Sequence, residues 1–565
     1  MLTILATWLL LFIINYLLGY LVKYTLKFQV GFGLQTLFGL ILTSVICGCA
    51  AFFIPINQTL LYAIILLALS VGLVFFKNII SECKAQLSTI NNTTSWSIII
   101  TAAICLAAYS SGYSKINDDG LYYIQTGMWL NKYGFVHGLS NLHVTLGLCS
   151  SWHILQAVFS FSSQIHLNDL NGFILLIYLF YILENYQTNT NKIFSLLQLT
   201  VIFILSIPFL SAPNPDWAVI VISAITFDLF YNKINKQYLP ITLILTAFAL
   251  SIKFSAIALI ILGLYCLYNS IQQSSLKKIA LSLFFAFIIV SLLITKNIYQ
   301  TGYPVYPYKP LAITQLDYTT PQEIVSYYSN GIKTWAISDK FKPNDVAEVN
   351  NINNWSYIKA LISRGGIKGF INILILLIAL LTSGILLLQQ IKKYNSKPIS
   401  ILHFVNIISI LIWLIIAPQY RFALPMLLFY IAWIGEFIIN KYLPQLITLL
   451  KPQWLLFPTA IMLIITLVGF DLGGNDTSKY IGKIEKLSMA HLLKPMPQYP
   501  FQYDTLVIDK QQYYYTHNNR YCWDAPLPCL PESYERMIRT NFNYTLQPRS
   551  NNVTDGFKYV SIPNN

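Results

Sequence analysis

Charged side chains are scarce in this sequence. Only 10% of its 565 residues are Asp, Glu, Lys or Arg, whereas 56% are hydrophobic. Soluble domains carry about 25% charged residues, so this composition excludes an ordinary soluble globular protein. The apolar residues form runs of about twenty, a length that crosses a hydrocarbon core roughly 30 Å thick. The sequence therefore predicts a polytopic integral membrane protein.

Several motifs are missing as well. No basic stretch is dense enough to follow a phosphate backbone, so the net charge of +14 does not indicate a nucleic-acid partner. The sequence lacks a glycine loop of the kind that cradles nucleotide phosphates, and no two histidines have the helical spacing of a zinc motif. The first twenty residues lack a basic region and a cleavage site, so we expect a retained helix there. No internal repeat is visible, which disfavours transporter folds built from inverted halves.

The apolar runs predict about fourteen membrane-spanning helices. The stretch 238–270, interrupted by Lys253, is alternatively a single broken hairpin. The fold class is therefore all-α and polytopic, with a small mixed α/β domain after the last helix. The expected helices lie near residues 2–22, 30–54, 58–76, 95–111, 168–185, 192–210, 215–231, 238–251, 254–270, 278–297, 367–390, 399–417, 421–439 and 453–470.

Lysines are distributed unequally between alternate loops, and this sets the expected orientation. By the positive-inside rule, the lysine-rich loops are cytoplasmic. The long loops 112–167 and 298–366 and the tail from residue 471 then face outward. The opposite short loops contain a single lysine, Lys253. The lysine-rich set comprises Lys23, Lys27, Lys77, Lys84, Lys192, Lys233, Lys236, Lys277, Lys278, Lys392, Lys393, Lys397, Lys441 and Lys451.

This orientation divides the chain into three parts. We expect N-terminal helices over 1–94, a membrane core over 95–470, and an extracytoplasmic domain over 471–565. Cys522 and Cys529 lie in the outward tail, where an oxidising compartment permits a disulfide between them. The abundance of Ile, Lys, Asn and Tyr is typical of an AT-rich bacterial genome, which suggests the bacterial cytoplasmic membrane as the location.

Adjacent carboxylates, Asp118 and Asp119, follow a predicted spanning helix at the membrane boundary. Ionisable groups at that depth are costly and tend to be functional. Either carboxylate could deprotonate an acceptor hydroxyl or hold a divalent cation such as Mg²⁺ or Mn²⁺. The alternative interpretation is that both merely cap the following helix.

Other polar residues are candidates for substrate contact. Asp216 opens a predicted helix, where capping is again the alternative, and His143 lies in the first outward loop. Three basic residues at outward helix ends contradict the general charge bias and would suit a lipid phosphate: Lys253, Lys296 and Arg421. Snorkelling to the interface is the alternative explanation for each of them.

The order of these features resembles the GT-C superfamily of membrane glycosyltransferases. The resemblance rests on the acidic pair after an early helix, the interfacial segments and Arg421 in Pro-Gln-Tyr-Arg-Phe-Ala-Leu-Pro. Asp119-Gly-Leu-Tyr-Tyr, which includes Tyr122 as a candidate substrate contact, and Cys522-Trp-Asp-Ala-Pro-Leu-Pro-Cys also resemble a largely uncharacterised bacterial multi-pass family. The sequence departs from the superfamily because three additional helices precede the helix before the acidic pair.

The resemblance implies sugar transfer from a polyprenyl-phosphate donor to a glycan, lipid or protein acceptor on the outer face, among membrane lipids. Asp118 or Asp119 would be the general base, Arg421 with Lys253 or Lys296 would stabilise the departing phosphate, and no cofactor is required. A divalent cation at Asp118 and Asp119 remains an alternative. So do three other functions: a polysaccharide polymerase or ligase using Arg364, a carrier or flippase, and a non-catalytic scaffold.

Overall fold

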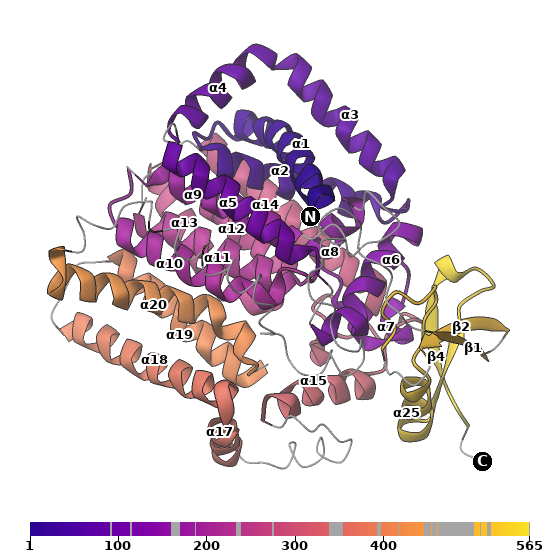
Figure 1. Cartoon of the computed structure of the whole chain (residues 1–565). Helices are drawn as coiled ribbons and strands as arrows, with labels where there is room; N and C mark the ends of the chain where they lie inside the picture. Colours follow the sequence, from indigo (N-terminus) through magenta and orange to yellow (C-terminus); the bar gives the residue numbers. More distant parts are fainter. Residues whose placement is uncertain are drawn as a thin grey trace.

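The structure is a computed structural model in which most of the chain is described. The described residues are 1–90, 93–112, 116–159, 170–186, 188–232, 239–273, 276–337, 354–391, 397–416, 418–445, 454, 460, 502–508, 510–516 and 521–563. Long helices form one body, and a small region of strands lies at one end of it (Figure 1).

Eight described helices are long and apolar enough to cross a membrane, and a ninth crossing is present if α3 and α4, bent by 91°, form one span. The chain is thus a largely helical, polytopic membrane protein, but the expected number of about fourteen spans is not confirmed. The run 453–470 lies outside the described residues, apart from 454 and 460. The eight helices are α1 (Leu2–Leu26), α2 (Phe32–Ala50), α5 (Thr93–Ser110), α10 (Lys192–Ser206) with the turn that follows it, α14 (Leu276–Thr301), α18 (Gly366–Ile391), α19 (Lys397–Ile416) and α20 (Tyr420–Tyr442).

Several other predicted runs form shorter helices. The break at Lys253 separates α12 from α13, and these two helices pack against each other as a hairpin does. With 14 and 15 residues, each is shorter than the roughly twenty residues that one crossing needs. The remaining helices of this body are α3 (Gln58–Val74), α4 (Phe76–Ser88), α9 (Leu170–Asn185), α11 (Pro215–Asn232), α12 (Leu239–Ile252) and α13 (Leu259–Gln273).

Helices α1 and α2 approach each other closely because glycines face the partner backbone. A Cβ atom added at Gly19 would lie 1.8 Å from the carbonyl oxygen of Gln35, and one at Gly39 would lie 1.8 Å from that of Asn15. Small residues let helix backbones meet in membranes in this way. One hydrophobic core runs from Ile4 in α1 to Ala432 in α20, so the N-terminal helices are integrated into the same body.

Parts of the three segments that were expected to face outward lie together at one end of this body: the first loop, the second loop as far as residue 337, and the strands of the tail (Figure 1). Asn141 from the first loop donates to the carbonyl of Tyr318 in the second loop (2.7 Å) and to that of Phe557 in the tail (3.0 Å). The first loop contains the π-helix η1 (Asp119–Tyr123), α6 (Ile124–Tyr133), α7 (Leu139–Leu142), η2 (Val144–Leu148) and α8 (Ser151–Val158). The second contains α15 (Gln322–Ile337) and α17 (Asn354–Ser363).

The described part of the tail is mixed α/β, as expected. Strand β1 (Tyr503–Ile508) pairs antiparallel with β2 (Gln511–Thr516), with Tyr503 opposite Thr516. Strand β3 (Tyr544–Pro548) pairs antiparallel with β4 (Phe557–Ser561), and α25 (Glu532–Phe542) precedes β3. Each two-stranded sheet is too small to be stable alone, so the tail depends on packing against the first loop.

Candidate functional site

Four charged residues from distant parts of the sequence meet where helices of the main body begin or end. We call Asp118, Asp216, Lys253 and Arg421 the charged cluster. Arg421 Nη1 lies 2.6 Å from Asp118 Oδ2, and Arg421 Nε lies 3.4 Å from Asp216 Oδ2. The ammonium group of Lys253 pairs with Asp216 Oδ1. The cluster thus contains two carboxylates and two cations linked in one chain of ion pairs.

The capping interpretation fails for the side chain of Asp118. Asp118 is the N-cap residue of η1, but its side chain makes no capping hydrogen bond and instead pairs with Arg421. Asp216 lies in the first turn of α11, where its charge suits the positive end of the helix dipole. Its backbone N–H, however, donates to Asn214 Oδ1 (2.7 Å), which caps the helix. Since Asn214 takes that role, the carboxylate of Asp216 is available to the two cations.

The cluster is largely shielded from water. Only 2% of the Asp216 side chain is exposed, against 17% for Asp118 and about one-fifth for each cation. The Lys253 ammonium lies 3.9 Å from the centroid of the Phe422 ring, a cation–π contact. Charges in such a site interact more strongly than they would in water. The arrangement can therefore hold an anionic group and a reactive carboxylate close together.

Buried aromatic residues adjoin the cluster. The Tyr123 hydroxyl lies 3.5 Å from Asp118 Oδ2 and 3.4 Å from Asn214 Oδ1. Its ring contacts that of Tyr122, with centroids 4.4 Å apart. Tyr122 is thus beside the cluster. Burial raises the pKa of both phenols well above the ordinary value, so both remain protonated and can donate hydrogen bonds.

The remaining candidates lie elsewhere. Asp119 is completely buried, and it is Asp118 that forms the ion pair with Arg421. Lys296 donates to the carbonyl of Cys149 and to Asn297 Oδ1, each at 2.6 Å, so it is not a member of the charged cluster. His143 bonds Thr145 Oγ1 (2.6 Å) and packs on Tyr534 of α25, with ring centroids 4.2 Å apart. Burial lowers the pKa of His143 to about 4, so it is neutral and joins the loop to the tail.

A divalent cation has little support from the donor set. Among the described residues, no three His, Cys, Asp or Glu side chains lie close enough to form a metal site. Mg²⁺ and Mn²⁺ require oxygen ligands, and here both carboxylates of the cluster already contact cationic side chains. A metal at Asp118 would have to displace Arg421, so we derive no chemistry through a metal.

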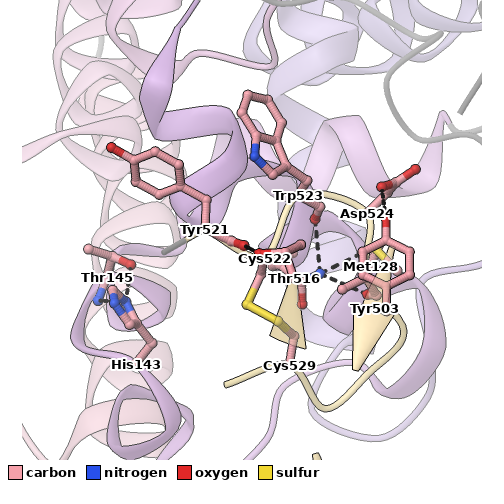
Figure 2. Close-up of a disulfide and its surroundings, with 12 residues drawn as sticks. Met128, His143, Thr145, Tyr503, Thr516, Tyr521, Cys522, Trp523, Asp524 and Cys529 are labelled. Carbon is pink, nitrogen blue, oxygen red and sulfur yellow. Dashed lines mark hydrogen bonds between the residues drawn. A yellow bond between two sulfur atoms is a disulfide. The ribbon is translucent and has the colours of Figure 1, made fainter. Parts of the chain in front are cut away.

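The predicted disulfide between Cys522 and Cys529 is present, and the short loop that it closes carries Trp523 and Asp524 (Figure 2). The backbone N–H groups of Cys522 and Trp523 both donate to the carbonyl of Gly120 at 2.9 Å. Gln125 Nε2 donates to the carbonyls of Trp523 and Ala525, also at 2.9 Å. The loop thereby contacts η1 near its start, directly after Asp118, and the first turn of α6.

Replacing both cysteines by serine is expected to loosen this contact. Closing a loop of this length stabilises a fold by about 2–3 kcal/mol, so the amides of 521–525 should exchange with solvent on the order of 50-fold faster. Hydrogen–deuterium exchange measured by mass spectrometry tests this, with Cys49→Ser as the control because Cys49 is an exposed free cysteine. Unchanged exchange in 521–525 would show that the bond does not hold the loop on η1.

Some residues of the site were not selected from the sequence. Asn214 caps α11, and its signal is the segment Pro213-Asn-Pro-Asp, in which Asn precedes the first helical turn. Tyr123 and Phe422 each follow a selected residue directly, but aromatic residues are too common in this chain to stand out. Trp523 packs on Gly120, where an added Cβ would lie 2.4 Å from Trp523 Cε2. No pattern in the sequence predicts that long-range contact.

Comparison with known proteins gives one match. A family model described as Domain of unknown function (DUF8201) matches residues 1–428. The matched region includes the whole charged cluster and ends within α20, whereas the disulfide loop lies beyond it. No curated protein and no solved structure matches the chain.

Proposed function

The chain belongs to the family described as Domain of unknown function (DUF8201), and we propose from its charged cluster that it is a membrane glycosyltransferase. In this proposal, a sugar moves from a polyprenyl-phosphate donor to an acceptor hydroxyl on a glycan, lipid or protein. The observation that carries the proposal is the convergence of Asp118, Asp216, Lys253 and Arg421 where helices of the main body begin or end. A base beside phosphate-binding groups is what such a reaction needs.

Asp118 is the proposed general base. Its carboxylate, held by Arg421 at 2.6 Å, can accept the proton of an acceptor hydroxyl. The acceptor oxygen forms a bond to the anomeric carbon while the bond from that carbon to the phosphate oxygen breaks. The electron pair of the broken bond stays on the polyprenyl phosphate, and the anomeric configuration inverts.

Arg421 and Lys253 are the proposed phosphate contacts. A guanidinium has five N–H donors. The contacts of Arg421 with Asp118, Gln419 and Asp216 use Nη1 and Nε, so within the described part of the chain Nη2 remains available. Donors arranged in advance around a developing phosphate charge lower the barrier to its departure. Asp216 holds both cations in place and is a positioning residue in this scheme.

The outer face of the bacterial cytoplasmic membrane is the proposed location of the reaction. The support is the lysine asymmetry of the sequence, together with the contacts that gather both long loops and the tail at the end where the cluster lies. A lipid-linked donor suits this compartment because nucleotide sugars are cytoplasmic. The tail, whose loop 522–529 is closed by the disulfide, would cover the site from outside.

The rival functions lack comparable support. Glu184, which a carrier could use along a path, accepts hydrogen bonds from the backbone of Phe32 (2.6 Å) and Gly33 (3.1 Å) at the start of α2. Glu436 accepts one from the Tyr231 hydroxyl (2.9 Å). Arg364, the residue that would indicate a polymerase or ligase, donates to the carbonyl of Ala336 (2.6 Å) and is not a member of the cluster. These interactions are structural.

Donor cleavage tests the proposal. The full chain in lipid nanodiscs would be mixed with lipid-linked sugars and acceptors extracted from membranes of its host. We expect polyprenyl phosphate to be released and the sugar to appear on an acceptor. Transfer of a polyprenyl-pyrophosphate-linked oligosaccharide instead would indicate a polymerase or ligase. Intact donor that merely changes leaflet would indicate a carrier and overturn the proposal.

A further inference from the structure

His153 lies next to the charged cluster but has no role in the scheme above. It belongs to α8, and only 1% of it is exposed. Its ring contacts the rings of Tyr123 and Tyr122, with centroids 5.3 and 6.1 Å away. Tyr123 in turn reaches Asp118 through its hydroxyl. His153 is therefore separated from the proposed base by one aromatic side chain.

The hydrogen bonds of His153 determine which ring nitrogen carries the proton. The backbone N–H of Ser150 donates to Nδ1 at 3.1 Å, as part of the capping box that begins α8. A backbone N–H can only donate, so Nδ1 is the acceptor and is unprotonated. Burial, and then the positive charges of Lys296 and Lys253, lower the pKa of His153 to about 3. The ring is consequently neutral, with its hydrogen on Nε2.

The Nε2–H group has no hydrogen-bond partner in the described part of the chain, although it is fully buried. Leaving such a donor unsatisfied costs roughly 1–3 kcal/mol, so a buried polar group of this kind calls for an explanation. Positive charge is nearby, because Lys296 is anchored on the carbonyl of Cys149, the residue before Ser150. A donor in a positive environment beside a proposed phosphate site favours an anionic oxygen as its missing partner.

We infer that His153 is a further substrate-binding residue, whose Nε2–H donates a hydrogen bond to a phosphate oxygen held beside Lys253. The inference rests on the proposed function for the identity of the substrate, and it extends the phosphate site from Arg421 and Lys253 to α8. A neutral imidazole adds a directional donor without further charge, so it fixes how the phosphate is oriented. Binding of the phosphate would also satisfy the buried donor.

Two isosteric substitutions separate this role from a structural one. Asparagine places its carbonyl where Nδ1 lies and so keeps the bond from Ser150, but it lacks a group at the position of Nε2. Glutamine places an N–H donor near the position of Nε2. We expect His153→Asn to weaken binding of a radiolabelled polyprenyl monophosphate about tenfold or more, and His153→Gln to remain within about threefold of wild type. Binding is measured with the full chain in phosphatidylcholine nanodiscs.

The control variant is Ser150→Ala, which removes the capping hydroxyl and leaves the backbone donor in place. If His153 acts only through the cap, Ser150→Ala or His153→Gln will weaken binding at least as much as His153→Asn does, because His153→Asn keeps the acceptor for the Ser150 N–H, and the inference is overturned. Wild-type binding by His153→Asn, or equal weakening by His153→Asn and His153→Gln, also overturns it. Inorganic phosphate is the second probe: competition shows that the phosphate group alone is recognised, and its failure shows that the polyprenyl chain is required.

This binding assay does not require sugar transfer. If His153→Asn loses binding but no sugar transfer is found for the wild type, the phosphate site stands and the transferase proposal fails. If the wild type transfers sugar and His153→Asn binds normally, only the inference about His153 fails. The two failures are therefore distinguishable.

Discussion

Asp216→Ala is expected to lower the free energy of unfolding by about 3 kcal/mol, because it leaves Lys253 and one contact of Arg421 without their carboxylate. Removing one partner of a buried ion pair typically costs 3–5 kcal/mol. The lower end applies here since about one-fifth of each cation is exposed to solvent. Unfolding by sodium dodecyl sulfate in mixed micelles measures the change. A loss below about 0.5 kcal/mol would contradict the network.

Two further variants define the origin of that loss. Asp216→Ala combined with Lys253→Met removes the pair as a whole, and it should recover part of the stability because no buried charge is left unpaired. Asp317→Asn is the matched control, since Asp317 is about half exposed and pairs with Arg549 at 3.0 Å. Exposed pairs contribute about 0–1 kcal/mol, so this variant should unfold almost as the wild type does.

Four of the candidate residues could be selected from the sequence because each combines a charge with a position at a helix end. Asp118, Asp216, Lys253 and Arg421 were identified in this way, and the structure brings them together. Their pairing could not be predicted, because residues separated by up to 303 positions are joined only when the helices pack. Charge at membrane depth is costly, so a charged residue there has to find a partner.

Position alone does not distinguish a member of the cluster from a neighbour. Asp119 and Lys296 satisfy the same sequence criteria as Asp118 and Lys253. Successive residues of a helix point in different directions, and of the two adjacent carboxylates it is Asp118 that faces Arg421. Lys296 faces the carbonyl of Cys149 instead, since it lies inside α14 and not at a break between helices.

The number of membrane spans is the property that hydropathy leaves most open. Apolar runs identify helices reliably, but a run of 14 or 15 residues is apolar whether it crosses a membrane or packs inside a bundle. The contact between the disulfide loop and η1 could not be predicted from sequence patterns either. It depends on hydrogen bonds from the Gln125 side chain and to the Gly120 carbonyl, between residues about 400 positions apart, and on the fit of Trp523 to Gly120.

Asp118→Asn is expected to have the largest effect on activity. Asparagine keeps the size of the side chain and an oxygen that can accept from Arg421, so the fold should survive. It cannot accept a proton at neutral pH, and loss of a general base typically lowers the rate 10²- to 10⁴-fold, a range we expect here. Binding of polyprenyl monophosphate should change far less, because Arg421 and Lys253 remain.

The most direct measurement is therefore made in host cells whose only copy of the chain carries Asp118→Asn. Surface glycan and lipid-linked sugar donors are quantified together, after equal insertion of the wild-type and variant chains in the membrane has been verified, with Asp317→Asn as the control. The account predicts loss of the glycan, accumulation of its lipid-linked donor, and a wild-type pattern for Asp317→Asn. Wild-type glycan and donor levels with Asp118→Asn would show that the charged cluster does not carry out sugar transfer.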